Sequence, residues 1–278
     1  MSDYAINCRG RLLRMETPLV MGILNVTPDS FYEGSRVNRE DALLRRAEQM
    51  LREGAAILDI GGYSSRPGAE HVDAQTELAR VVPAIESLHR HFPEAFLSVD
   101  TFRASVAKAA VEAGACMIND ISGGNLDESM FPTVATLQVP YVLMHMKGTP
   151  QTMQLNPEYD DVIMEINRFF ARRIEELHAL EVNDILVDPG FGFGKTLDDN
   201  YRILKHLDTF GRHGKPVLIG ISRKSMLYKY LDGRPEDMLN ATTAVHMLAL
   251  QNGASVLRVH DVKEAVEAVR LFVKYTAV

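Results

Sequence analysis

Polar residues that could bind or act on a ligand end about eight short apolar runs along this chain. They include carboxylates, amides, a hydroxyl and imidazoles, and they are Asn25, Asp59, Asp100, Asn119, His145, Asp188, Ser222 and His260. If the runs are parallel strands of one barrel, all their carboxyl ends meet on a single face. We therefore predict that residues far apart in sequence surround one cavity there.

Three of these residues share a chemistry that suits a flat, nitrogen-rich ligand. Asp100, Asn119 and Asp188 end buried runs, where an unpaired carboxylate or amide costs free energy. One such residue alone would most simply cap a neighbouring loop. Three converging polar ends instead favour a heterocycle whose guanidine-like edge presents several N–H donors in one plane.

Cationic residues after the seventh and eighth runs predict an anion site. Lys224 and Ser225 stand at the start of a predicted helix, and helix N-termini attract anions. Arg258 and His260 end the eighth run, and barrels commonly bind phosphate at their seventh and eighth loops. The alternative is that Arg258 and His260 are structural and form a salt bridge, with Asp261 as the partner.

Three loops carry weaker signals. GGYSSRPGAEH offers Ser65 and Arg66 for an anion, with a solvated turn as the equal alternative. DPGFGFGK lacks the P-loop spacing, so we predict a sharp turn beside a flat ligand, with Phe191 and Phe193 as apolar walls. His145 lacks the clustered ligands of a metal site and is predicted to be a hydrogen-bonded core or rim histidine.

The elements that must position these residues alternate between strand and helix patterns. Residues 19–25 (LVMGILN) are almost all apolar, as in a strand covered on both faces. Helical spacing recurs over 40–53, which Gly54 ends, and over roughly 160–180. The alternation predicts an α/β fold, a (β/α)8 TIM barrel, as a single domain over 1–278 with 1–17 as an N-terminal extension. A doubly wound open sheet, the alternative, normally has a glycine-rich turn after the first strand, where this chain has NVTPDSF.

Composition sets the class of protein and its expected location. Hydrophobic residues make up 46% and charged residues 24%, as in an ordinary globular protein, and the net charge of −7 argues against a nucleic-acid surface. Cys8 and Cys116 are the only cysteines, so neither a disulfide framework nor a thiolate metal site is indicated. The N-terminus lacks a signal-peptide core and no run is long enough to span a bilayer, so we expect a cytoplasmic protein without a membrane partner.

Several segments, taken in order, resemble the motifs of the dihydropteroate synthase family. They are MGILNVTPDSF, GGYSSRPGA, SVDTF, IND, MHMKGTP, DPGFGFGK, ISRKS and RVHDV, and the resemblance runs from Leu19 to the last predicted helix. It implies condensation of 6-hydroxymethyl-7,8-dihydropterin diphosphate with 4-aminobenzoate, giving 7,8-dihydropteroate and diphosphate in folate synthesis. It also implies Mg²⁺ as cofactor, competitive inhibition by sulfonamides, and a homodimer through the last helices.

The resemblance assigns roles to individual residues. The residues expected to hold the pterin edge are Asp100, Asn119, Asp188 and Lys224. Those expected to hold the diphosphate are Ser65, Arg66, Arg258 and His260, with Asn25 meeting the Mg²⁺ bound to it. Those expected around 4-aminobenzoate are Phe31, Pro67, Phe193 and Ser225. The catalytic set is then Asp100, Lys224, Arg258 and His260.

One loop departs from the family pattern and keeps two alternatives open. The family's second loop usually reads glycine-glycine-glutamate-serine-threonine-arginine-proline, whereas Tyr63 replaces the acid here and Ser65 the threonine. Arg66 and a hydroxyl are retained, so activity is expected. The alternatives are a catalytically silent pterin-binding paralogue, which would bind without releasing diphosphate, and a methyltetrahydrofolate methyltransferase-type barrel, which needs no diphosphate site.

Overall fold

Eight parallel strands form the centre of the molecule. The computed structural model describes residues 4–27, 36–63, 72–153 and 157–278. The strands, in their order across the sheet, are β8 (Ile185–Asp188), β7 (Tyr141–Met144), β6 (Met117–Asp120), β5 (Phe96–Asp100), β4 (Ile57–Gly61), β3 (Leu19–Asn25), β10 (Val256–Val259) and β9 (Leu218–Ile219). The backbone N–H of Val187 donates to the carbonyl of Pro216 at 3.0 Å, and a parallel bridge joins Val187 to Val217. This contact brings the two edge strands together, so the predicted barrel is confirmed and the doubly wound sheet is excluded.

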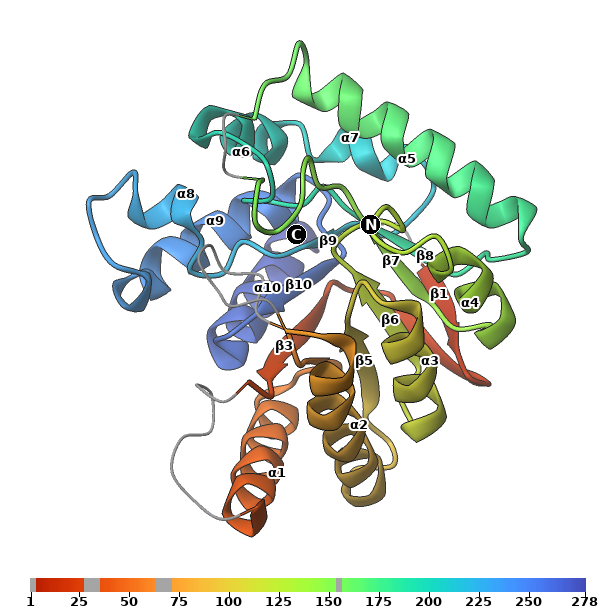
Figure 1. The fold of residues 1–278 in the computed structure, drawn as a ribbon. Helices are drawn as coiled ribbons and strands as arrows, with labels where there is room; N and C mark the ends of the chain where they lie inside the picture. The colour runs from red at the N-terminus through yellow and green to blue at the C-terminus, as the bar shows by residue number, and fades with distance from the viewer. Residues whose placement is uncertain (1–3, 28–35, 64–71, 154–156) are drawn as a thin grey trace.

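Helices surround the strands on the outside of the barrel (Figure 1). They are α1 (Arg36–Glu53), α2 (Ala74–His91), α3 (Ala104–Ala113), α4 (Met130–Leu137), α5 (Val162–Ala179), α6 (Leu197–Lys205), α7 (Asp208–Gly211), α8 (Ser225–Tyr228), α9 (Leu239–Gln251) and α10 (Val262–Thr276), with a 3-10 turn at Pro235–Asp237. The long helix predicted over 160–180 is α5. Asp161 caps it by accepting from the N–H groups of Ile163 and Met164, and Ile166 and Phe170 face the core.

An N-terminal hairpin covers one end of the barrel, and the sequence analysis treated it only as an extension. Strands β1 (Tyr4–Cys8) and β2 (Arg11–Met15) pair antiparallel. Arg9 and Gly10 connect them with φ angles of 56° and 86°, the left-handed pair that a type I′ turn requires. The buried side of the hairpin packs against residues at the amino ends of the barrel strands, such as Met21 and Met117. The alternation of YAINC and RLLRM about Arg-Gly was the available signal.

Two adjacent leucines of β2 test how much the hairpin contributes to stability. Leu13 is 5% exposed and packs against the barrel, whereas Leu12 is 57% exposed. We expect Leu13→Ala to lower the free energy of unfolding by about 2–5 kcal/mol, because it removes buried methyl groups and leaves a cavity. Leu12→Ala, the matched control, should change it by less than about 0.5 kcal/mol. Urea unfolding measures both, and equal effects would contradict a packed hairpin.

None of the helices in the described part of the chain is a candidate for a membrane span. No helix there combines the length and the apolar character that crossing a bilayer demands.

Candidate active site

The structure places six of the eight predicted strand-end residues at or next to the end of a strand. Asn25, Asp100 and Asp188 are the last residues of β3, β5 and β8. Asn119 is the penultimate residue of β6, and His145 and His260 directly follow β7 and β10. Two predicted strand ends are wrong: Asp59 lies in the middle of β4, and Ser222 lies three residues beyond β9.

Arg258 connects three strands through its guanidinium. Its Nε donates to Oδ2 of Asp59 and its Nη2 to Oδ2 of Asp100, both at 2.6 Å. The amide of Asn119 donates to the same oxygen of Asp59 at 2.9 Å. β10, β4, β5 and β6 therefore contribute to one network across the barrel. The alternative of a salt bridge is confirmed for Arg258, but its partners are Asp59 and Asp100; Asp261 instead accepts two hydrogen bonds, of 2.9 and 2.7 Å, from Arg223.

Burial changes the charge balance of the acidic strand ends. It raises the pKa of Asp100 to about 7, although Arg258 acts in the opposite direction. It also raises the pKa of Asp188, against Lys224 and the backbone N–H of Gly190, which donates at 2.7 Å. Oδ1 of Asp59 is buried and makes no hydrogen bond within the described residues. Such acceptors suit a ligand edge that carries N–H donors.

Lys224 lies against the turn that follows β8. Its ammonium donates to the carbonyl of Phe191 and lies 4.4 Å from the ring centre of Phe193. Gly192 has φ of 79°, and a Cβ there would meet Cδ of Lys224 at 3.3 Å, so the close approach favours glycine. Burial lowers the pKa of Lys224 to about 8, with Asp188 acting against the shift. The turn and the lysine thus form one packed unit.

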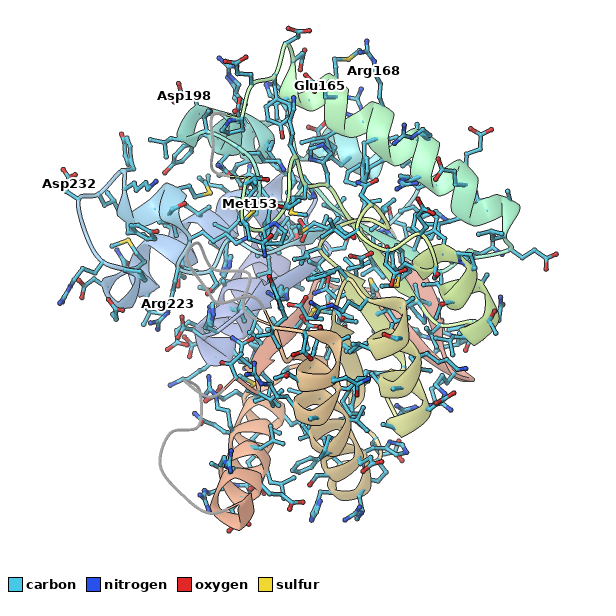
Figure 2. The ribbon with its side chains drawn as sticks, in the orientation of Figure 1. Met153, Glu165, Arg168, Asp198, Arg223 and Asp232 are labelled. Carbon is cyan, nitrogen blue, oxygen red and sulfur yellow. The ribbon has the colours of Figure 1, made fainter. Side chains whose placement is uncertain are left out.

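The two phenylalanines of this turn differ in position. Phe191 is fully buried in the main core, so its predicted place as a wall of the site is wrong. Phe193 is partly buried and packs with Phe102 against a cluster of Ile121, Met144, Met146 and Met153. Figure 2 shows Met153 among side chains gathered near the centre of the molecule, whereas the exposed Arg168 and Asp232 lie at its edge. Phe193 therefore lies on this cluster beside Phe102, and its role as a wall of the site stays a prediction.

A buried lysine, Lys195, was missed by the sequence analysis. Its Nζ bonds to Nδ1 of His145 at 3.1 Å, to the His145 carbonyl at 3.2 Å and to the Phe193 carbonyl at 3.0 Å. Burial lowers its pKa to about 7 and holds the pKa of His145 well below its usual value. His145 is buried and hydrogen-bonded, and Lys195 ties the turn after β8 to the end of β7. The signal in the sequence was a lysine that directly follows the glycine-rich turn, at the end of GFGFGK.

The remaining predicted residues divide between the barrel mouth and segments outside the described residues. His260 Nδ1 lies 3.1 Å from Oγ of Ser222, and Ser225 is the first residue of α8, which has only four residues. Phe31, Ser65, Arg66 and Pro67 lie outside the described residues.

Oxygen atoms of two strand ends both lie beside Gly61. A Cβ added there would stand 3.3 Å from Oδ1 of Asn25 and 3.7 Å from Oδ2 of Asp100. Across the described ranges, histidines, cysteines and carboxylates form no group of three that could hold a metal. Asn25 therefore borders the acidic network.

The fold and the site together define a pterin-binding barrel, and the family model "Pterin binding enzyme" matches residues 21–260. Dihydropteroate synthase of Escherichia coli (strain K12) is 43% identical over 265 residues, covering 95% of this chain and 93% of that protein. Yersinia pestis dihydropteroate synthase, solved with a sulfonamide drug, superposes with a TM-score of 0.92 at 44% identity, covering 99% of this chain and 100% of that one. The Xanthomonas albilineans enzyme with 4-aminobenzoic acid gives 0.92 at 42% identity over 100% of both chains. The chain belongs to the dihydropteroate synthase family.

Proposed function

We propose that the protein condenses 6-hydroxymethyl-7,8-dihydropterin diphosphate with 4-aminobenzoate to give 7,8-dihydropteroate and diphosphate. The observation that carries the proposal is the Arg258 network with Asp59 and Asp100, which joins acidic acceptors and a guanidinium across β10, β4 and β5. Membership of the dihydropteroate synthase family points the same way. A methyltransferase-type barrel would need no cationic group for a diphosphate.

The pterin edge would be held by Asp100, Asn119, Asp188 and Lys224. Asp188 is buried and its carboxylate can accept from two adjacent N–H groups of the heterocycle. Lys224 can donate to a ring acceptor from beside Phe193. The raised pKa of Asp188 supports this assignment, because a buried carboxylate is stabilised by exchanging water for fixed N–H donors.

The diphosphate would be held by Arg258 and His260, with Ser65 and Arg66 from the second loop. A guanidinium has five N–H donors. The contacts to Asp59 and Asp100 use one each from Nε and Nη2, which leaves others for the leaving group. Asn25 offers a hard amide oxygen beside Asp100, the kind of ligand that Mg²⁺ takes together with water and phosphate oxygens. Bound Mg²⁺ would supply charge neutralisation of the leaving group.

The bond changes are then a substitution at the pterin methylene carbon. Its C–O bond breaks and the electron pair leaves with the diphosphate, whose charge Arg258 and His260 spread. Asp100 stabilises the cationic methylene that remains, and the neutral aniline nitrogen attacks it and then gives up a proton to the released diphosphate or to solvent. No bond to the enzyme forms. A pterin–protein adduct detected by mass spectrometry during turnover would contradict this sequence of steps.

The aminobenzoate would lie against Phe193, with its carboxylate at Ser225 and with Phe31 and Pro67 completing the pocket. Ser225 offers a hydroxyl and a backbone N–H at the first position of α8. Sulfonamides share the aniline ring and an anionic group in place of the carboxylate. We therefore place sulfonamides in the same pocket.

Product formation from the two substrates tests the function. Purified protein with pterin diphosphate, Mg²⁺ and 4-aminobenzoate should release diphosphate and form a product with the mass of 7,8-dihydropteroate. A sulfonamide should raise the KM for 4-aminobenzoate and leave kcat unchanged. Pterin binding without diphosphate release would instead favour the silent paralogue, and sulfonamide inhibition that is not competitive would contradict the Phe193–Ser225 pocket.

A homodimer through the last helices completes the proposal, with the enzyme acting in the cytoplasm. Large apolar side chains lie exposed on these helices: Leu248 of α9, and Leu271 and Tyr275 of α10. Such exposure favours a partner surface. Sedimentation equilibrium should give twice the chain mass, and Leu271→Arg should shift it toward the monomer.

A further inference from the structure

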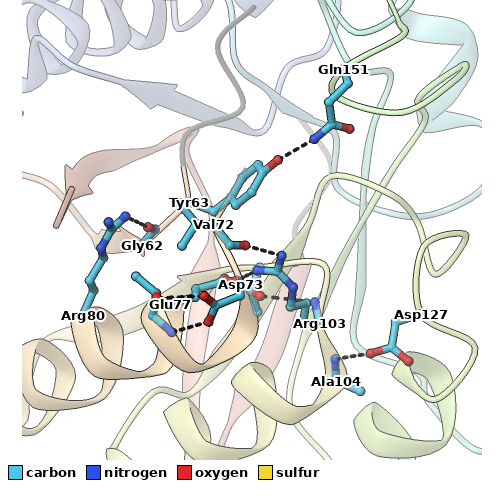
Figure 3. Close-up of polar contacts among 12 residues, drawn as sticks. Gly62, Tyr63, Val72, Asp73, Glu77, Arg80, Arg103, Ala104, Asp127 and Gln151 are labelled. Carbon is cyan, nitrogen blue, oxygen red and sulfur yellow. Dashed lines mark hydrogen bonds and ion pairs between the residues drawn. The ribbon is translucent and has the colours of Figure 1, made fainter. Parts of the chain in front are cut away.

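Tyr63 connects two loops across the mouth of the barrel. It lies two residues beyond β4 and is 8% exposed, and its hydroxyl accepts a hydrogen bond of 2.9 Å from the amide of Gln151 (Figure 3). Gln151 belongs to the loop after β7. Because β5 and β6 lie between β4 and β7 in the sheet, this contact crosses the loops above the strands that carry Asp100 and Asn119.

Arg103 holds the chain on both sides of the second loop. Its guanidinium carbon lies 5.4 Å from the ring centre of Tyr63, which precedes residues 64–71. Its Nη2 donates to the carbonyl of Val72, which follows them, and its Nη1 pairs with the buried carboxylate of Glu77. These contacts fix the two described residues that flank the loop to the start of α2 and to the loop after β5 (Figure 3).

The ring of Tyr63 also joins the apolar wall of the site. It packs edge-to-face on Phe102, with ring centres 5.1 Å apart and planes at 86°. Phe102 and Phe193 pack on the same cluster of Ile121 and methionines. A change at Tyr63 can therefore reach the surface on which the aminobenzoate ring is proposed to lie. The glutamate usual in the family at this position has no ring to stack there.

We propose that Tyr63 is a positioning residue, which acts with Gln151 and Arg103 to fix the wall formed by Phe102 and Phe193. The inference rests on the proposed function, since it names what sets affinity for the second substrate. Tyr63 touches no reacting atom of the proposed reaction. Its loss should therefore raise the KM for 4-aminobenzoate while changing kcat much less.

A double-mutant cycle on the Tyr63–Gln151 hydrogen bond tests the proposal. Tyr63→Phe keeps the ring and removes the hydroxyl, and Gln151→Ala removes the donor. We expect each single change to raise the KM for 4-aminobenzoate about 2- to 10-fold, the range of one neutral hydrogen bond. The double variant should be no worse than either single one, because both changes remove the same contact. Gln151→Glu should preserve the wild-type KM when Tyr63 is present, since the new carboxylate can accept a hydrogen bond from the phenol O–H.

The controls separate positioning from folding and from the proposed function itself. Tyr4→Phe removes a hydroxyl at the opposite end of the barrel and should leave KM, kcat and Tm unchanged. An unchanged KM in Tyr63→Phe, or additive effects in the double variant, would overturn the proposal, as would a fall in Tm that accounts for the lost activity. Wild-type protein that forms no dihydropteroate in the same assay would overturn the proposed function instead.

Discussion

Arg258→Ala is expected to lower the free energy of unfolding by about 3–5 kcal/mol and to abolish turnover. The stability loss follows from the partners of Arg258: Asp59 is fully buried, and Asp100 shares the same guanidinium. Removing the cation leaves one fully buried and one partly buried carboxylate without their counter-charge. Arg212→Ala, which breaks only an exposed ion pair with Asp208, should change stability little and serves as the control.

The cost of Arg258→Ala should depend on pH in a defined direction. The pKa of Asp100 is about 7 in the folded wild type and near 3.8 ordinarily. The folded protein therefore binds a proton that the unfolded chain releases between these values, and stability falls as pH rises through that range. Arg258 lowers the pKa of Asp100 and stabilises its ionised form. The loss of stability in Arg258→Ala should therefore be largest above about pH 7, where Asp100 is ionised, and smaller in acid. Urea unfolding at about pH 5.5 and about pH 8.5 measures the difference. The same loss at both values would contradict the ionic coupling.

Ligand binding separates the proposed diphosphate-binding role of Arg258 from its structural one. Under conditions where the Arg258→Ala variant remains folded, it should retain affinity for the free pterin and lose the additional affinity that the diphosphate confers. Calorimetry with the two ligands measures this difference. Equal loss of both affinities would refute the assignment of Arg258 to the diphosphate.

Asp100→Asn is expected to lower kcat by about 10²–10³-fold, the usual effect of removing one preorganised electrostatic group from a transition state. The substitution is isosteric, and the amide oxygen can still accept from Nη2 of Arg258. Below about pH 7 the carboxyl of the free wild-type enzyme becomes neutral, so wild-type kcat/KM should fall as pH decreases, by about tenfold per unit well below the pKa. The variant has no such group to titrate and should show a flat profile there.

Asp127→Asn provides the matched control for that measurement. Asp127 accepts a hydrogen bond of 2.7 Å from the N–H of Ala104, the first residue of α3, and the amide oxygen of an asparagine can accept the same hydrogen bond. Its kcat and pH profile should match those of the wild type. A pH profile of Asp100→Asn that still falls below neutrality would assign the titration to a different group.

The barrel was predictable because the two patterns that mark its strands and its helices each lie within a short stretch of sequence. Apolar runs such as residues 19–25 bury both faces of a strand, and the pattern over α5 marks one face of a helix. Asp59 shows where this fails: its side chain reaches the site from the middle of β4, because alternate residues of a strand share a face. The hairpin was missed since its strands have five residues each and only a two-residue turn between them.

The partners inside the site were not predictable from the sequence. Arg258 could have paired with its near neighbour Asp261, but barrel closure brings it to carboxylates 199 and 158 positions away. Which carboxylate a guanidinium meets is decided by three-dimensional packing, and so is the burial that shifts the pKa of Asp100 and Lys195. The ligand class could be predicted, because it depends on residue types, whereas the charge state of the site could not.

The hairpin has a practical consequence through the two cysteines of the chain. Cys8 lies within β1 and Cys116 directly precedes β6, and both are free, buried thiols of the same apolar cluster. The hydrogen bond with the Cys116 thiol and burial raise the pKa of Cys8, which keeps it in its unreactive thiol form. An alkylating reagent can modify these thiols only when the hairpin lifts or the whole chain unfolds. The rate of alkylation of the native protein would therefore measure how often the hairpin opens locally at the amino end of the barrel, opposite the strand ends that carry the proposed active site.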